Sequence, residues 1–217
     1  MMPFNKSYAS ARYAFVSGLD CDRIGYQEIE MKDVIDESEK KKRITRRSPQ
    51  LVLFQCILKK NSMEFIIQKS TEIGVDMIVP VVSGRVIPDS RKVSEKINRW
   101  QKISDSASKQ SKRDYKCKVL SPENIYSIVV SRFDLFYVPS EKSTCDDGNL
   151  LETLKGSLNA SSIGFIIGPE GGFEDSEVSF LKKNGFISVS LGDTTLRAET
   201  AAIIAGGIII QLSLIHI

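Results

Sequence analysis

Two short segments carry the residue types best suited to holding a ligand. "GPEGGF" (168–173) and "LGDTTLRAET" (191–200) each follow an apolar run. Glycine lets a backbone approach a ligand without a Cβ in the way, and the second segment adds a cation and a carboxylate, Arg197 and Glu199. In open α/β sheets, ligands bind beyond the carboxyl ends of strands. Both segments are therefore candidate ligand loops, provided that each follows a strand.

The side chains of these loops favour one class of ligand. The sequence contains neither G-x-G-x-x-G nor G-x-x-x-x-G-K-[ST], the usual nucleotide fingerprints. The acidic residues here, which would repel a polyphosphate, are Glu170, Glu174, Asp175 and Asp193. A cationic or zwitterionic ligand with an adenine and a ribose suits the loops better. Glycine is also common in ordinary strand-to-helix turns, so local chemistry alone leaves a purely structural role open.

Composition argues against several other kinds of protein. The only histidine is His216, so catalysis by Ser-His-Asp or Cys-His is not expected. The four cysteines form no C-x-x-C pair, which predicts reduced thiols and no metal site. The most apolar stretch, 201–210, has about half of the ~20 residues that a membrane span needs, and the N-terminus lacks the apolar core of a secretory signal. We expect a cytoplasmic protein that does not enter a membrane.

The elements that must position the two loops alternate along the chain from Leu51 onward. Apolar runs of strand length are "LVLFQCIL", "VDMIVPVV", "DLFYV", "SIGFIIG" and "ISVSLG". Helical periodicity falls between and after them, at 59–74, from about Ser94, and at 149–158, 177–185 and 199–210. Asn61 and Glu64 have capping-box spacing, and Gly74 is placed to stop the first helix. Strands that are almost wholly apolar predict a parallel sheet covered on both faces, hence an α/β fold.

A basic run marks the expected domain boundary. Six of the eight residues from Lys40 to Arg47 are Lys or Arg, among them Arg46 and Arg47. The residues before this run include short β-like segments. We therefore expect one domain over 1–49 and a second over 50–217. A solvated linker and an RNA-binding arm explain the basic run equally well.

Three segments together resemble a known family. "KSTEIGVDMIVPV", "IGPEGGFEDSEV" and "SLGDTTLRAETAA", in this order, are similar to the signature segments of the ribosomal RNA small subunit methyltransferase E family, over about Leu51 to Gln211. These SPOUT-class enzymes methylate N3 of a uridine in 16S rRNA. The resemblance implies a SPOUT-type parallel sheet whose C-terminal part forms a trefoil knot around S-adenosyl-L-methionine. It also implies a homodimer that acts on the small ribosomal subunit without a metal.

The resemblance assigns roles to individual residues of the two loops. The cofactor-binding positions that it implies are Ile167, Gly168, Gly172, Leu191, Gly192 and Leu196. Arg197 would face either the cofactor carboxylate or the RNA, where it could stabilise charge on the uracil oxygens. Glu199 would either cap the last helix or act in catalysis, and Glu170 is expected to hold its loop.

Further positions are implied to contact RNA. "SKQSKRDY" (108–115) is similar to a substrate-facing segment, with Gln110 and Arg113 as matches. Lys109 and Lys112 depart from that segment's usual acidic and glycine positions and add positive charge suited to phosphate. Arg85 in "SGRV" would contact RNA or the partner subunit, and Arg46 and Arg47 join the candidate RNA contacts.

The chain also departs from the family. The family usually has serine where this chain has Glu174, so Asp175 or Ser176 is expected to cap the following helix. Family members begin with a β-rich, PUA-like RNA-binding domain, and the roughly fifty residues before Leu51 are too few to complete one. Two alternatives stay open: another SPOUT RNA methyltransferase with a different target, or a non-enzymatic RNA-binding or ribosome-assembly remnant.

Overall fold

A parallel sheet forms the centre of the protein. The computed structural model describes residues 49–59, 61–84, 90–140, 148–155 and 160–215, which lie within one compact unit, Ser38–Ile217. The strands are β1 (Gln50–Cys56), β2 (Met77–Val82), β3 (Lys118–Val119), β4 (Glu123–Asn124), β5 (Leu135–Pro139), β6 (Ser162–Ile167) and β7 (Ile187–Val189). Their order is β3-β2-β1-β6-β5-β7, with β4 also paired to β2. All of these pairings are parallel, which confirms the predicted α/β class.

The two central strands are apolar because both of their faces are covered. β1 lies between β2 and β6, with Val52 opposite Met77 and Leu53 opposite Phe165. Six of the seven β1 residues are buried. Successive side chains on a strand point to opposite faces, so β1 and β6 contribute to two separate apolar layers.

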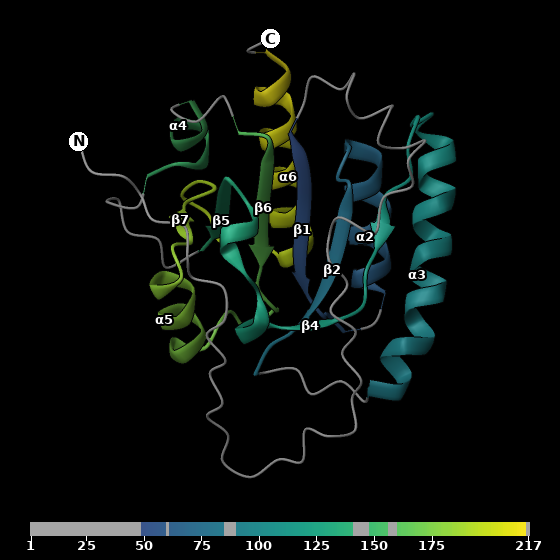
Figure 1. The fold of residues 1–217 in the computed structure, drawn as a ribbon, viewed down its shortest axis with the longest axis horizontal. Helices are drawn as coiled ribbons and strands as arrows, with labels where there is room; N and C mark the ends of the chain where they lie inside the picture. The colour runs from purple at the N-terminus through teal and green to yellow at the C-terminus, as the bar shows by residue number, and fades with distance from the viewer. Residues whose placement is uncertain (1–48, 60, 85–89, 141–147, 156–159, 216–217) are drawn as a thin grey trace, which may run out of the picture. The chain divides into compact units, whose positions relative to one another are not determined.

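Helices cover the sheet, and the last helix lies against the central strands (Figure 1). They are α2 (Ser62–Ile73), α3 (Ser90–Gln110), α4 (Leu150–Lys155), α5 (Asp175–Lys183) and α6 (Ala198–Ile215), with short 3-10 turns η2 (Ile125–Ser127) and η3 (Val130–Arg132). α6 packs on α2, α4, β1 and β6, and α3 packs on α2. The opposite layer contains aromatic rings in contact, from Phe54, Phe133, Phe136 and Phe186.

The ends of α2 test two of the predicted helix signals. Gly74 ends the helix with φ 117° and donates its amide to Thr71, which confirms the predicted stop. The predicted capping box is wrong, because the Asn61 side chain makes no capping hydrogen bond. Glu64 instead forms an ion pair of 2.9 Å with the guanidinium of Arg99 on α3. Glu64 could contact either the N-terminus of its own helix or a cation on the neighbouring helix. Residue spacing within one segment does not show which of the two contacts forms.

All strands of the sheet begin at one edge and end at the other, because every pairing is parallel. We call these the amino edge and the carboxyl edge. Residues that precede β2 and β3, such as Asp76 and Cys117, lie at the amino edge. The segments that follow β5, β6 and β7 begin at the carboxyl edge, as do the two predicted ligand loops. Among the described helices, none is both long enough and apolar enough to cross a bilayer.

Candidate functional site

A cavity of about 700 Å³ opens at the carboxyl edge of the sheet. Its walls come from the segment after β5, the loop after β6, the loop after β7 and the first turn of α6. All six predicted cofactor residues and both predicted catalytic residues line it. The structure thus brings together two segments that the sequence separates by about twenty residues, as the ligand-loop hypothesis requires.

The loop after β6 contains a tight turn with glycine at its left-handed position. The Gly172 amide donates to the Pro169 carbonyl at 2.9 Å, and Gly172 has φ 70°, a left-handed conformation that glycine adopts without strain. The Phe173 ring folds back over Gly168, where an added Cβ would lie 3.2 Å from the ring. The turn therefore presents backbone and one aromatic face to the cavity, and not a row of side chains.

The loop after β7 turns at a second glycine. Gly192 has φ 129°, and its amide donates to the Ser190 hydroxyl at 3.1 Å, while that hydroxyl donates to the Gly192 carbonyl at 3.1 Å. Leu191 and Leu196 flank the turn and line the cavity. Apolar side chains with exposed backbone between them form a surface suited to a flat, partly apolar ligand.

A buried carboxylate anchors the loop after β6. Glu177 on α5 is fully buried, and its two oxygens accept the amides of Gly84 at 2.9 Å and of Glu174 at 2.7 Å. The prediction that Asp175 or Ser176 caps α5 is wrong, because Glu174 is the N-cap residue and Glu177 reaches back to its amide. This contact ties the segment after β2 to the wall of the cavity.

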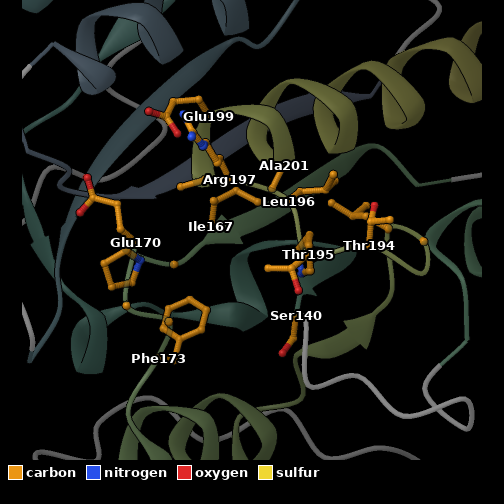
Figure 2. Close-up of a pocket in the computed structure, with 18 of the residues that line it drawn as sticks. Ser140, Ile167, Glu170, Phe173, Thr194, Thr195, Leu196, Arg197, Glu199 and Ala201 are labelled. Atoms are coloured by element: carbon orange, nitrogen blue, oxygen red, sulfur yellow. The ribbon is translucent and has the colours of Figure 1, made fainter.

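The start of α6 carries the charged residues of the site (Figure 2). The Arg197 carbonyl accepts the first helical hydrogen bond, from Ala201 at 2.8 Å, and the Arg197 side chain is exposed. The Glu199 carboxylate accepts a hydrogen bond from the Ser62 hydroxyl of α2 at 2.5 Å. That hydrogen bond, with a second from its own backbone amide and the nearby Arg197 cation, lowers the pKa of Glu199. Glu199 is therefore held as an anion that joins two helix N-termini.

Three lining residues with hydroxyl groups, Ser140, Thr194 and Thr195, had no role assigned from the sequence. Figure 2 shows Glu170 and Phe173 on one side of the cavity, with Thr194 and Thr195 across from them and Ser140 nearby. These three hydroxyl groups could hydrogen-bond a polar ligand. Ser140 follows β5, and the sequence offered one signal for it, because "YVPSE" also stands at a predicted strand end.

Arg113, which was predicted to contact RNA, lies at the opposite edge of the sheet. Its guanidinium donates to the carbonyls of Thr71 at 2.6 Å and Val75 at 2.7 Å, and lies 3.5 Å from the carboxylate of Asp76. Only 7% of the Arg113 side chain is exposed. The prediction is corrected: Arg113 has a structural role, because the chain's own acceptors occupy both terminal nitrogens of its guanidinium.

The other predicted RNA contacts do not join the cavity either. Gln110 is exposed at the end of α3, at the amino edge with Arg113. Arg46, Arg47 and Arg85 lie outside the described residues.

The described residues hold no group of three or more His, Cys, Asp or Glu side chains arranged for a metal. Cys56 and Cys117 are free and buried, and burial raises the pKa of Cys56 to about 12 and that of Cys117 to about 11. At neutral pH both thiols are therefore protonated and unreactive.

A protein-family model matches most of the chain. The model of the RNA methyltransferase domain covers residues 46–210. A second model, for the CRISPR-associated negative auto-regulator DevR/Csa2, matches residues 1–48, all outside the described part of the chain.

Curated relatives carry one name. The ribosomal RNA small subunit methyltransferase E of Mesomycoplasma hyopneumoniae is 36% identical over 70% of this chain and 66% of its own length. The protein of that name from Aquifex aeolicus is 28% identical over 79% of this chain and 71% of its own length. This chain thus spans about two thirds of the length of these relatives.

Solved structures share the fold. A putative methyltransferase from Legionella pneumophila, in complex with S-adenosylmethionine, is 31% identical, with a TM-score of 0.66 over 75% of this chain and 66% of its own. A ribosomal RNA small subunit methyltransferase E from Neisseria gonorrhoeae, bound to S-adenosyl methionine, is 30% identical, with a TM-score of 0.61 over 73% of this chain and 64% of its own. Since the family model covers both loops of the cavity, the chain belongs to the RNA methyltransferase domain family, as its resemblance to the small subunit methyltransferases E implied.

Proposed function

We propose that this protein transfers a methyl group from S-adenosyl-L-methionine to N3 of a uridine in 16S rRNA of the small ribosomal subunit. One observation carries the proposal. The two glycine-bearing loops meet around a single cavity with Arg197 and Glu199 at its rim. The curated relatives named for small-subunit rRNA methylation support the choice of substrate.

The cavity suits this cofactor in size and lining. Ligand pockets typically enclose about 300–1,000 Å³ and combine apolar walls with a few polar groups, and the cavity of about 700 Å³ falls within that range. Ile167, Leu191 and Leu196 would pack on the adenine and ribose. The backbone around Gly168, Gly172 and Gly192 would supply hydrogen bonds. When bound, the cofactor would provide an already activated methyl group.

The side chains at the rim would act on the uridine. Arg197 is an exposed cation beside the cavity, placed to stabilise negative charge on a uracil oxygen as N3 loses its proton. Glu199 has a lowered pKa and two hydrogen bonds, so it suits an electrostatic and positioning role better than that of a proton acceptor. Holding N3 in line with the methyl group would then supply much of the rate.

Other parts of the proposal concern the whole molecule. We propose that the segments after β6 and β7, together with α6, form a trefoil knot. We also propose that the protein is a cytoplasmic homodimer. Exposed apolar side chains on two helices that pack together, Phe65 on α2 (46% exposed) and Ile204 on α6 (36% exposed), support a dimer face there. We further propose that residues 1–49 form a partial PUA-like RNA-binding domain and that residues 50–217 form the methyltransferase domain. The proposed RNA contacts are Arg46, Arg47, Arg85 and Gln110.

The decisive experiment uses labelled S-adenosylmethionine and small subunits that lack the modification. We expect label on one uridine of 16S rRNA, located by nuclease mapping, and N3-methyluridine in the nucleoside digest. Label on a different RNA or base would instead favour another SPOUT methyltransferase. Calorimetry addresses the non-enzymatic alternative: a protein that does not bind the cofactor is not a methyltransferase of this kind.

A further inference from the structure

Besides the basic run at 40–47, positive charge is concentrated in one further stretch of the chain, away from the cavity. Residues 90–118, which include α3 and the turn after it, contain ten Lys or Arg and three Asp or Glu, whereas the net charge of the entire chain is only +3. The remainder of the chain is therefore net acidic. Segregation of charge onto one element creates a local positive potential that the overall charge conceals.

The helical part of this charge lies on the outer face of α3. Trp100 and Ala107 are buried on the side that packs on α2, while Lys102 and Lys109 are exposed. Positions seven residues apart share one helix face, and two turns separate these two lysines by roughly 10 Å along the axis. Neither lysine makes an ion pair with any residue that the structure describes.

Lys112 extends the face in a conformation that is costly for its residue type. Its φ is 54°, which makes it the only non-glycine residue with positive φ among those described. Its amide and that of Arg113 close the end of α3 on the carbonyls of Lys109 and Ser108, at 3.2 and 3.0 Å. Glycine fills this left-handed position without strain. The Lys112 side chain is exposed and has no ion-pair partner in the described ranges. A lysine in this strained conformation does not favour stability, so the positive charge better explains why lysine stands at this position.

We propose that Lys102, Lys109 and Lys112, here called the α3 basic surface, bind phosphates of the RNA substrate outside the cavity. The inference rests on the proposed function for the identity of the polyanion. Because Lys109 and Lys112 lie at the amino edge and the cavity lies at the carboxyl edge, the α3 basic surface contacts RNA remote from the target uridine. Its contribution is therefore to affinity, and not to the chemical step.

The experiment measures binding of full-length protein to a 16S rRNA fragment at several salt concentrations, with thermal unfolding and cofactor calorimetry in parallel. Lys112→Gly should raise Tm by about 2–4 °C by relieving the strained conformation, and yet weaken RNA binding. Each lost phosphate contact lowers the slope of log K against log salt by about 0.7–0.9. The triple change Lys102→Gln/Lys109→Gln/Lys112→Gln should lower that slope by about 2–3 and raise Kd by about tenfold or more.

Matched variants separate charge from conformation. Lys112→Asn removes the charge but tolerates left-handed backbone, so it should weaken binding as Lys112→Gly does, whereas Lys112→Arg should bind like the wild type. The control Lys155→Gln/Lys182→Gln/Lys183→Gln removes three exposed lysines from α4 and α5 and should leave the slope unchanged. All variants should bind the cofactor normally.

The outcomes distinguish this inference from the proposed function. If the wild type methylates RNA but Lys112→Gly and the triple variant keep its affinity and salt slope, the α3 basic surface is wrong and the methyltransferase stands. If the wild type binds RNA through these lysines but transfers no methyl group, the surface stands and the proposed activity fails. A wild type that does not bind the fragment overturns the inference directly.

Discussion

At the scale of single residues, backbone groups and side chains have different roles in the cavity. Gly172 and Gly192 have left-handed conformations that shape the two loops, and apolar and hydroxyl side chains of these loops line the cavity. Besides Glu170, the charged residues of the lining are Arg197 and Glu199, where α6 begins. Binding of the cofactor and stabilisation of the substrate should therefore respond to different substitutions.

Arg197→Ala tests the charge at the rim. Removing one preorganised group that stabilises developing charge typically lowers a rate by about 10²–10³-fold, so methyl transfer at saturating cofactor should fall by about that factor. Because Arg197 is exposed, Tm and the cofactor Kd should change little. Single-turnover transfer to rRNA measures the rate. An equal loss in cofactor affinity would show that Arg197 faces the cofactor and not the uracil.

Glu199→Gln tests whether the carboxylate acts as a base. Its pKa is lowered in the folded protein, chiefly by the Ser62 hydroxyl, so it is ionised throughout pH 6–9 and the pH–rate profile of the variant should keep its shape there. Loss of one limb of that profile would establish a proton-transfer role.

The same carboxylate affects stability in acid. A group whose folded pKa is depressed stabilises the fold above its unfolded pKa of about 4.3, and this contribution disappears as pH falls through the folded value. The free energy of unfolding in urea at pH 7 should therefore be larger for the wild type than for Glu199→Gln, by under about 1 kcal/mol because the group is largely solvated. The margin should shrink as pH falls below the unfolded value and through the folded one. A margin that did not change with pH would contradict the lowered pKa.

Residue types marked the two segments as candidate ligand loops, and the family resemblance supplied the individual positions that line the cavity. Neither gave the roles of the charged groups. The function of Arg113 was not recognisable, since an arginine next to a lysine-rich helix end looks the same whether it faces solvent or the C-terminus of α2. That choice depends on Asp76, a buried carboxylate far away in the sequence.

At the scale of elements, polar contacts hold helix and strand ends together at the amino edge. Arg113 closes the C-terminus of α2, and Asp76 accepts the Leu51 amide at the start of β1 at 2.9 Å. Asp134 gathers the amides of Ser161 and Ser162 where β5 and β6 begin, and these hydrogen bonds lower the pKa of Asp134. Such contacts fix the sheet at its amino edge and leave the carboxyl edge to the cavity.

Arg113→Ala should be among the most destabilising single substitutions. It leaves Asp76 as a buried charge without its cation and removes donors from the carbonyls that end α2, a loss of about 3–5 kcal/mol. Arg99→Ala is the matched control, since it breaks an exposed ion pair with Glu64 and should cost under about 1 kcal/mol. Urea unfolding measures both. Equal midpoints for the two variants would contradict the structural role of Arg113.

Element type was predictable from periodicity, whereas element ends were not. Apolar runs predicted the long strands and the burial of α6. The two-residue strands β3 and β4 carry too little pattern to be seen, and α3 begins at Ser90, before the expected start near Ser94. The capping of α5 depended on Glu177 reaching Gly84, a contact between segments 93 residues apart.

At the scale of the whole molecule, the two buried thiols report global opening. With pKa values of about 12 and 11, Cys56 and Cys117 should not react with alkylating reagents at pH 8 while the protein is folded. In a Cys21→Ser/Cys145→Ser background, labelling should follow the population of unfolded protein across a urea titration. Rapid labelling in the absence of urea would show that β1 or the turn after α3 opens locally.

The central pairing of β1 with β6 has a consequence for synthesis. The sheet joins the first described strand to one that is made more than a hundred residues later, and Ser62 meets Glu199 across 137 residues. Pairings so distant in the chain form slowly, because a long loop must close before any contact offsets its entropy. While the polypeptide is emerging from the ribosome, β1 and β2 are made before β6. The apolar edge of β1 that pairs with β6 is therefore unpaired during this time. The cavity is complete only once residues 191–201 have been made, so a chain interrupted before them would lack one of its walls.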